Sequence, residues 1–160
     1  MENSARRMIL IVDDDPLMAD SLQQMIKMIV EDRQLDLHIE VCAVTSVIAC
    51  DKARLLVRTI LAGASEFRLF LMSDWAAPEP GAGTKLISEL LKLVSADARR
   101  LEEMPLADPQ FYFEAVLCSG GGTTAKEDAD RLGVRFIGKP MGLAELCEEL
   151  RLPIERLVGR

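Results

Sequence analysis

The sequence predicts one α/β domain built on a five-stranded parallel sheet, with strand order 2-1-3-4-5 and helices on both faces. Two observations support this fold class. Short apolar runs alternate along the chain with segments whose apolar residues recur at helical spacing. The apolar runs are also nearly unbroken, which is typical of parallel strands buried on both faces. Because right-handed crossovers join successive strands, the helices between them cover both sides of one sheet.

The first predicted strand is the apolar run at residues 9–12, which leads directly into three aspartates at positions 13–15. Pro16 follows at a position where a helix can begin, because its missing N–H is not needed in the first turn. Helical spacing then predicts a helix from residue 15 to about residue 30. Adjacent carboxylates repel one another, so the three aspartates need a cation, a proton or a basic side chain nearby.

The remaining elements continue the same alternation. Further strands are predicted at residues 39–44, 67–72, 113–118 and 134–137. Further helices are predicted at residues 46–61, from 84 to 94 or as far as 103, at 125–132 and at 143–150. Pro153 is expected to prevent the last helix from continuing undisturbed, because a proline inside a helix removes a hydrogen bond.

Composition restricts the class of protein. Of the 160 residues, 49% are hydrophobic, which is enough for one packed domain. A net charge of −7 disfavours non-specific binding to nucleic acid or to an anionic membrane. No apolar run approaches the ~18 to 20 residues of a membrane span, and the N-terminal run is too short and too acidic for a signal peptide. We therefore expect a cytoplasmic protein with no direct nucleic acid or membrane partner.

The cysteines and the lone histidine give little sign of a metal site. Cys42, Cys50, Cys118 and Cys147 form no C-x-x-C pair, and three of the four lie in apolar segments. We expect reduced thiols in the core of a cytosolic protein. His38 has no second ligand near it in the sequence and is expected at the surface, which excludes a histidine-rich metal site.

Residues that carry chemistry stand where four of the predicted strands end. These residues are Asp13 and Asp14 after strand one, Asp74 after strand three, Ser119 after strand four and Lys139 after strand five. In a parallel sheet the carboxyl ends lie on one edge, and strands one and three are neighbours in this order. Carboxylate oxygens suit Mg²⁺, while an ammonium and a hydroxyl can meet the oxygens of a phosphoryl group.

The order of these motifs identifies a family resemblance. The motifs are Val12-Asp13-Asp14, Asp74 with Pro78 and Gly83 after it, Ser119, and Lys139-Pro140. Together they resemble the receiver domain of two-component response regulators, a family with a flavodoxin-like fold. The pair Asp74-Trp75 is similar to the version in chemotaxis response regulators. The resemblance covers about residues 7–152, so that residues 1–160 are interpreted as a single receiver domain.

The resemblance implies a phosphorylation site that depends on a metal ion. Asp74 would be the phosphoacceptor. Asp13, Asp14 and Asp74 would hold Mg²⁺ together with the backbone carbonyl of Ala76. The implied donor is a sensor histidine kinase or a phosphotransfer protein, and the chain would be a signalling module and not an enzyme.

The resemblance also implies a switch. Ser119 takes the hydroxyl position and Lys139 the lysine position of the family, and Phe136 falls at its switch aromatic. Phosphorylation would change the face formed by helix four, strand five and helix five. The apolar stripe of the last helix is interpreted as core or as the seam of a homodimer; it consists of Leu143, Leu146, Leu150, Ile154 and Leu157.

The sequence departs from the family pattern at three places. The loop from Asp74 to Gly83 is one residue longer than usual and has Ala77 before its proline, a Gly-Gly-Gly run follows Ser119, and the connection at about 95–110 is long. A degenerate receiver that serves only as a docking module is therefore an alternative function.

Simpler roles and a second chemistry also stay open at this point. Asp15 would cap a helix, and Trp75 would anchor its loop. Ser119 is an alternative cap for the helix that follows it. A haloacid-dehalogenase-like phosphatase could use Asp13 and Asp15, but it needs another acidic pair on a strand after the lysine. The acidic pair that this requires is not seen on a later strand, since Glu145, Glu148 and Glu149 lie in the last predicted helix.

Overall fold

The computed structural model describes residues 5–35, 37–64, 66–103 and 110–159. Its strands are β1 (Arg6–Val12), β2 (Glu40–Val44), β3 (Glu66–Asp74), β4 (Gln110–Ser119) and β5 (Arg135–Gly138). Its helices are α1 (Pro16–Asp32), α2 (Ala49–Gly63), α3 (Ala82–Glu103), α4 (Thr123–Leu132) and α5 (Leu143–Val158). The strands form one sheet in the order β2-β1-β3-β4-β5, all parallel, so the predicted fold class and strand order are confirmed.

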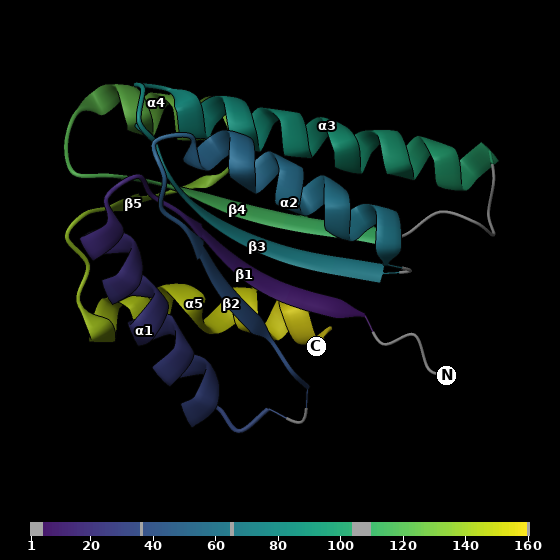
Figure 1. The fold of residues 1–160 in the computed structure, drawn as a ribbon, viewed down its shortest axis with the longest axis horizontal. Coiled ribbons are helices and arrows are strands. Elements are labelled where there is room, and N and C mark those ends of the chain that lie inside the picture. Colours follow the sequence, from purple (N-terminus) through teal and green to yellow (C-terminus); the bar gives the residue numbers. More distant parts are fainter. Residues whose placement is uncertain (1–4, 36, 65, 104–109, 160) are drawn as a thin grey trace.

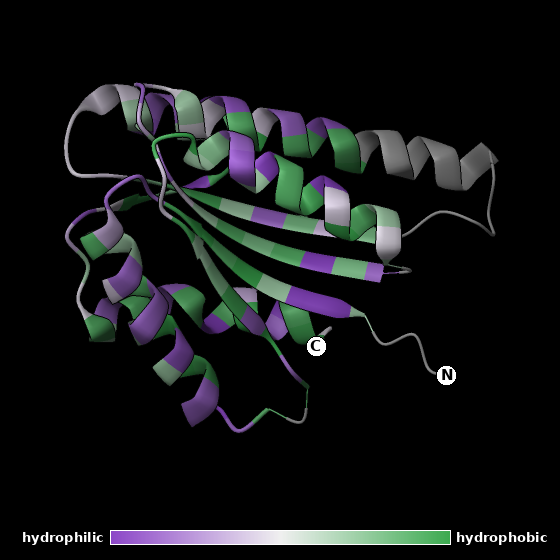
Figure 2. Cartoon of the chain, in the orientation of Figure 1, coloured by the Kyte–Doolittle hydropathy of each residue, from purple (hydrophilic) through white to green (hydrophobic). Residues whose placement is uncertain are grey.

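Helices cover both faces of this sheet (Figure 1). Helices α2, α3 and α4 lie on one face, and α1 and α5 lie on the other. Strand β1 explains why both faces are apolar: Met8, Leu10 and Val12 point into the first core, and Ile9 and Ile11 point into the second. Most of the strand surface toward the carboxyl ends is hydrophobic, with hydrophilic residues near the strand starts, while the helices carry both kinds of residue (Figure 2). This is expected for a sheet buried on both sides by amphipathic helices.

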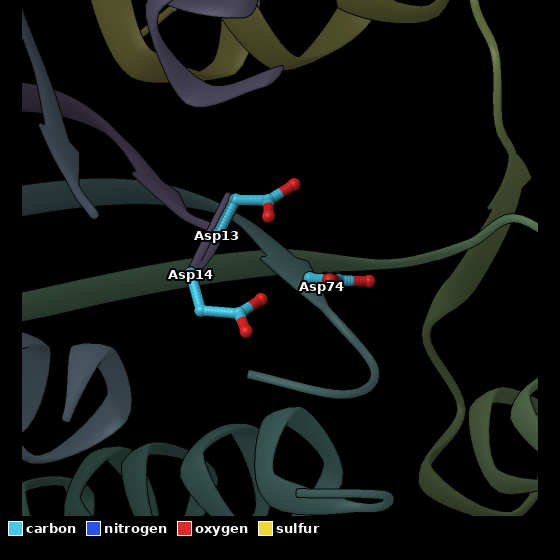
Figure 3. Close-up of side chains that lie close together, drawn as sticks. All are labelled: Asp13, Asp14 and Asp74. Carbon is cyan, nitrogen blue, oxygen red and sulfur yellow. The ribbon is translucent and has the colours of Figure 1, made fainter. Parts of the chain in front are cut away.

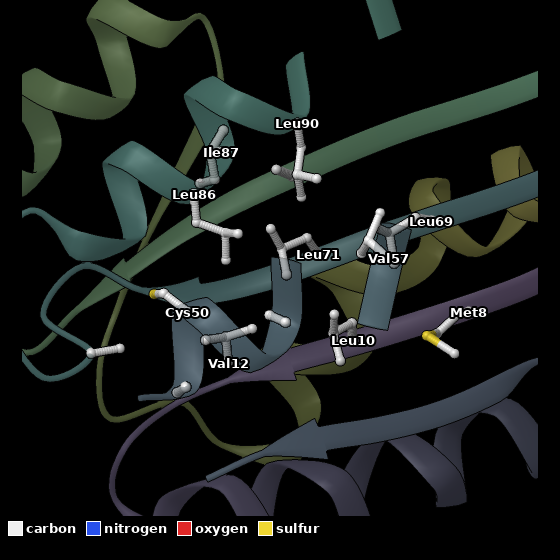
Figure 4. Packing of buried hydrophobic residues seen from close by; sticks show 14 of the residues in the cluster. Met8, Leu10, Val12, Cys50, Val57, Leu69, Leu71, Leu86, Ile87 and Leu90 are labelled. Carbon is white, nitrogen blue, oxygen red and sulfur yellow. The ribbon is translucent and has the colours of Figure 1, made fainter. Parts of the chain in front are cut away.

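The larger core lies between the sheet and the pair α2 and α3 (Figure 4). Leucines of β1 and β3 meet Val57 of α2 and Leu86 and Leu90 of α3 there, and all of them are fully buried. This packing fixes the first turn of α3, and with it the loop that joins β3 to α3.

The register of the sheet aligns the strand ends that carry polar residues. Val12 pairs with Ser73, so that Asp13 follows β1 directly beside the end of β3. Ser119 pairs with Gly138, so the residue after β5 is Lys139 at the same edge. The predicted convergence at the carboxyl edge is therefore present in the fold.

The predicted behaviour of the last helix is wrong, because α5 continues through Pro153 to Val158. A proline leaves the carbonyl four residues earlier without its helical donor, and here that carbonyl belongs to Glu149. Arg135 on β5 donates to this oxygen from its Nη2 at 2.9 Å. Apolar residues after the proline, Ile154 and Leu157, are buried in the second core, which gives the helix a reason to continue.

The single-residue expectations were only partly correct. Cys50 and Cys118 are buried and Cys42 is half-buried, but Cys147 is exposed, so its predicted place in the core is wrong. Burial raises the thiol pKa of Cys50 to about 11 and that of Cys118 to about 12, so both stay protonated at neutral pH. His38 is exposed, as predicted.

The observed boundaries of the elements differ from the predicted ones by a few residues. Helix α2 begins at Ala49 instead of residue 46, and α3 reaches Glu103, the longer of its two predicted ends. Part of the long connection at 95–110, namely 104–109, lies outside the described residues. Within the described part of the chain, no helix has the length and apolar character needed to cross a membrane.

Candidate functional site

Three aspartates meet at the carboxyl edge of the sheet (Figure 3). Asp13 and Asp14 follow β1, and Asp74 is the last residue of β3. Each offers one carboxylate oxygen, and these three oxygens lie within 4.8 Å of one another. Asp13 is buried and the other two are partly exposed, so the cluster has a closed inner side and an outer side open to solvent.

The backbone around Asp13 is fixed on both sides. Its N–H donates to the carbonyl of Val44 at 3.1 Å, which extends the pairing between β1 and β2 by one residue. Its Oδ1 accepts the N–H of Asp15 at 2.9 Å. Asp15 itself caps α1 by accepting the N–H of Leu17 at 3.0 Å, which confirms its predicted role.

The segment after Asp74 requires a glycine nearby. The N–H of Gly83 donates to the carbonyl of Trp75 at 3.1 Å, and this brings the start of α3 against the end of β3. A Cβ at position 83 would lie 2.1 Å from the carbonyl oxygen of Asp74 and 2.9 Å from Oγ of Ser73. No side chain fits there, so Gly83 allows α3 to begin beside the aspartate.

Lys139 neutralises part of the cluster. Its Nζ lies 2.5 Å from Oδ2 of Asp13 and 3.4 Å from Oδ1 of Asp74. Its backbone N–H donates to the carbonyl of Ser119 at 2.9 Å, which holds the residue at the end of β4. Burial of the ammonium lowers its pKa, but the hydrogen bond to Asp13 and the charges of Asp74 and Asp13 outweigh this, so the pKa of Lys139 is raised and the side chain stays charged.

The pKa of Asp74 lies above its ordinary value. Burial is the largest cause; Lys139 opposes it, and the charges of Asp13 and Asp14 add to it. Partial burial and the two neighbouring carboxylates therefore disfavour the ionised form of Asp74. A further positive charge on the open side of the cluster would stabilise the ionised form of Asp74 and lower its pKa.

The chemistry of the three aspartates fits Mg²⁺. Hard carboxylate oxygens that converge from three residues, with one side open to water, are the ligands that this ion takes. The residues that would hold it are Asp13, Asp14 and Asp74. Ala76 lies two residues after Asp74, in an isolated antiparallel bridge with Pro80, and its carbonyl as a ligand stays a prediction.

The structure brings Ser119 to the same edge but engages its hydroxyl locally. Its Oγ donates to the carbonyl of Gly121 at 3.0 Å and receives the N–H of the same residue at 3.4 Å. The N-cap of α4 is Gly122, which makes no side-chain cap, so Ser119 does not cap that helix. Phe136 is half-buried against the core beneath α2 and α3.

Two polar residues that sequence reasoning missed, Thr84 and Asp128, lie beside the loop after Asp74. The indole Nε1 of Trp75 and the hydroxyl of Thr84 both donate to Oδ2 of Asp128, each at 2.9 Å. Asp128 lies on α4 among other acidic residues, and no feature of the sequence distinguishes it from them. Trp75 is half-buried and hydrogen-bonded, in agreement with its interpretation as a loop anchor.

Comparison with known proteins places this geometry in a known fold. No family model matches the sequence, and no curated protein matches it. Among solved structures, a response regulator receiver domain (CheY-like) from Methylobacillus flagellatus matches with a TM-score of 0.56 at 18% sequence identity. The aligned region covers 92% of this chain and 98% of the chain from Methylobacillus flagellatus. The chain has the fold of a receiver domain.

A second solved structure has a similar fold. The two component transcriptional regulator AraC from Clostridium phytofermentans matches with a TM-score of 0.56 at 20% identity, over 95% of each chain. The topology also weakens the phosphatase alternative. That function needs an acidic pair on a strand after Lys139, and within the described residues only helix α5 follows β5.

Proposed function

We propose that this chain is a receiver that accepts a phosphoryl group on Asp74 from the phosphohistidine of a sensor histidine kinase or phosphotransfer protein. One observation carries the proposal: the carboxylate of Asp74 shares a cluster with Asp13 and Asp14 and also forms an ion pair with Lys139. A carboxylate nucleophile between a cation site and a fixed ammonium is the arrangement that phosphoryl transfer requires.

The transfer forms one bond and breaks one. An oxygen of Asp74 attacks phosphorus, the P–N bond to the donor histidine breaks, and the leaving imidazole nitrogen takes a proton from solvent. Lys139 is 3.4 Å from Oδ1 of Asp74 before reaction, so its ammonium needs little movement to meet an equatorial phosphoryl oxygen. Asp13, Asp14 and Asp74 would hold Mg²⁺, which would supply positive charge for the same oxygens when bound.

The product changes the electrostatics of the site. A phosphoryl group adds about −1.5 to −2 charge beside two aspartates that already repel one another. Ser119 must then leave its contacts with Gly121 to donate to the phosphoryl group, and Phe136 follows into the space that this opens. The face of α4, β5 and α5 shifts between two packings, and a downstream protein distinguishes them. The product remains on the protein, so the chain acts as a signalling module.

The test uses Trp75, the only tryptophan, which adjoins Asp74. Mg²⁺ should change its fluorescence, and beryllofluoride, which mimics a phosphoryl group on a carboxylate, should change it further. Acetyl phosphate with Mg²⁺ should add the mass of one phosphoryl group to the protein. Asp74→Asn should abolish the beryllofluoride response and the added mass, since it removes the nucleophilic oxygen.

Other outcomes would point to the alternatives. If the wild-type protein neither takes up the phosphoryl group nor responds to beryllofluoride, the chain is a docking module with a receiver fold. Turnover of p-nitrophenyl phosphate that survives Asp74→Asn and is lost in Asp13→Asn would instead identify a phosphatase.

A further inference from the structure

Helix α4 is joined to the segment after the phosphoacceptor by one carboxylate. Oδ2 of Asp128 accepts a hydrogen bond from Nε1 of Trp75 and another from Oγ1 of Thr84, both at 2.9 Å. Its other oxygen accepts from Nη2 of Arg131 at 2.8 Å. Only 14% of the Asp128 side chain is exposed, and the side chain of Thr84 is buried. Three donors therefore surround a single shielded acceptor.

This carboxylate is ionised in the folded protein. The hydrogen bond from Trp75 is the largest cause of a lowered pKa at Asp128, and Thr84 and Arg131 act in the same direction against the effect of burial. Hydrogen bonds to a charged acceptor are stronger than those between neutral groups. The contact therefore joins three elements firmly: the loop after β3, the first turn of α3, and α4.

Helix α4 has a small apolar face. It buries two alanines, Ala125 and Ala129, whose side chains offer only one methyl group each, and its last residue, Leu132, packs partly buried against the first core. Three glycines, at 120–122, precede the helix, and a Cβ on any of them would meet open space. Because this apolar face is small, polar contacts contribute to the position of α4, and Asp128 supplies the one to the loop after β3.

The other partner, Trp75, is next in sequence to a residue of the proposed metal and phosphoryl site. It follows Asp74 in sequence, and its N–H donates to the carbonyl of Cys118 at 2.8 Å. Trp75 is the residue between Asp74 and Ala76 in the chain, so the position of Trp75 constrains both of its neighbours. Asp128 restrains the indole of Trp75 from helix α4.

We propose that Asp128 is a positioning residue that latches the loop after the phosphoacceptor to α4, so that occupancy of the aspartate cluster and the position of α4 are coupled. This inference rests on the proposed function, because it acts through the Mg²⁺ and phosphoryl site. Coupling is reciprocal: the latch strengthens Mg²⁺ binding, and binding in turn holds α4. Ser119 and Phe136, which lie on β4 and β5, take no part in these hydrogen bonds of Asp128.

The experiment compares the wild-type chain of residues 1–160 with three variants. Asp128→Ala removes the acceptor. Thr84→Val removes one donor, keeps the charge of Asp128 and nearly keeps the side-chain volume at position 84. Asp130→Ala is the matched control, because it removes the same charge from an exposed position on the same helix. Calorimetric titration measures the affinity for Mg²⁺, and amide hydrogen exchange of residues 123–132 is followed with and without Mg²⁺ and beryllofluoride.

We expect Asp128→Ala to weaken Mg²⁺ binding about five-fold or more, Thr84→Val to weaken it less, and Asp130→Ala to leave it unchanged. Mg²⁺ and beryllofluoride should slow exchange in α4 of the wild type and of Asp130→Ala, but not of Asp128→Ala. A residue with only a structural role would lower thermal stability without changing this response. If Asp128→Ala does not fold, Thr84→Val decides by the same two measurements.

Two results would overturn the latch, and they can be told apart. Equal Mg²⁺ affinity and equal α4 protection in the Asp128 and Asp130 variants, with normal binding by the wild type, would refute the latch and leave the proposed function intact. No Mg²⁺ binding and no beryllofluoride response by the wild type would refute both.

Discussion

At the scale of one residue, the ionised carboxylate of Asp74 lowers the stability of the folded protein. Burial and the charges of Asp13 and Asp14 raise its pKa, and Lys139 compensates only in part. The folded protein therefore binds a proton at Asp74 more tightly than the unfolded chain does. The stability that this gives is present at low pH and is lost as pH rises through the folded pKa, because the ionised carboxylate is then held in an unfavourable place.

Asp74→Asn should therefore stabilise the protein in the absence of Mg²⁺. An amide keeps the shape of the side chain and removes its charge, while Lys139 keeps its contact with Asp13. At neutral pH we expect a gain of about 1 kcal/mol, which is about 2 to 4 °C in the thermal midpoint for a chain of this size. The gain should shrink as pH falls into the range where Asp74 of the wild type is also neutral.

Thermal unfolding of both proteins across pH measures this gain. Asp130→Asn is the control, since it makes the same change at an exposed position. An Asp74→Asn protein that is less stable than the wild type at neutral pH would contradict the electrostatic account.

At the scale of elements, α5 shows how one side chain can permit a proline in a helix. Arg135 on β5 donates to the carbonyl of Glu149, which Pro153 leaves without a donor, and it also contacts the Glu149 carboxylate at 2.6 Å. Arginine suits this position because its several N–H groups reach both oxygens at once. The C-terminal half of α5 is thus supported by a neighbouring strand.

Arg135→Gln should destabilise the fold by about 1 kcal/mol, because the carbonyl of Glu149 loses its donor. In a Pro153→Ala background the same change should cost less, since the helix then supplies an N–H to that oxygen. A double-mutant cycle in urea measures this difference. Arg151→Gln, at a surface pair on the same helix, should be close to neutral. An equal cost of Arg135→Gln in both backgrounds would show that only the ion pair matters.

At the scale of the whole molecule, the sheet gathers an aspartate cluster from distant parts of the chain. Asp13 and Asp74 belong to separate strands, and only the pairing of β1 with β3 brings their oxygens together. The unfolded chain has no such cluster, so the proposed Mg²⁺ ion would bind the folded state alone and would stabilise it by mass action. The net charge of −7 adds general attraction for cations, which has to be separated from binding at the site.

Mg²⁺ at a hundred times its dissociation constant should stabilise the wild type by about 2.7 kcal/mol, or about 5 to 10 °C in the thermal midpoint. Asp13→Asn should lose most of this increase, because it removes a ligand. Differential scanning calorimetry at constant ionic strength, balanced with KCl, separates binding from screening. A rise that KCl reproduces, or that Asp13→Asn retains, would mean that no specific site exists.

The sequence by itself determined much of the fold and the central residues of the site. Unbroken apolar strands and helical periodicity are local patterns, so they were readable without coordinates, and strand ends are known once strands are known. Asp13, Asp14, Asp74 and Lys139 could be found in this way because each follows an apolar run.

Only the tertiary structure decided the contacts between elements that sequence patterns treat separately. Nothing in the sequence pairs Asp128 with Trp75, or Arg135 with the carbonyl that Pro153 leaves free. The physical reason is that a hydrogen bond between side chains is lost when its partners shift by roughly a few tenths of an ångström to one ångström. The positions of the partners are set by how the helices pack on the sheet. Hydrophobic patterning fixes which face of a helix is buried, but it leaves open which polar residue at its rim meets which partner.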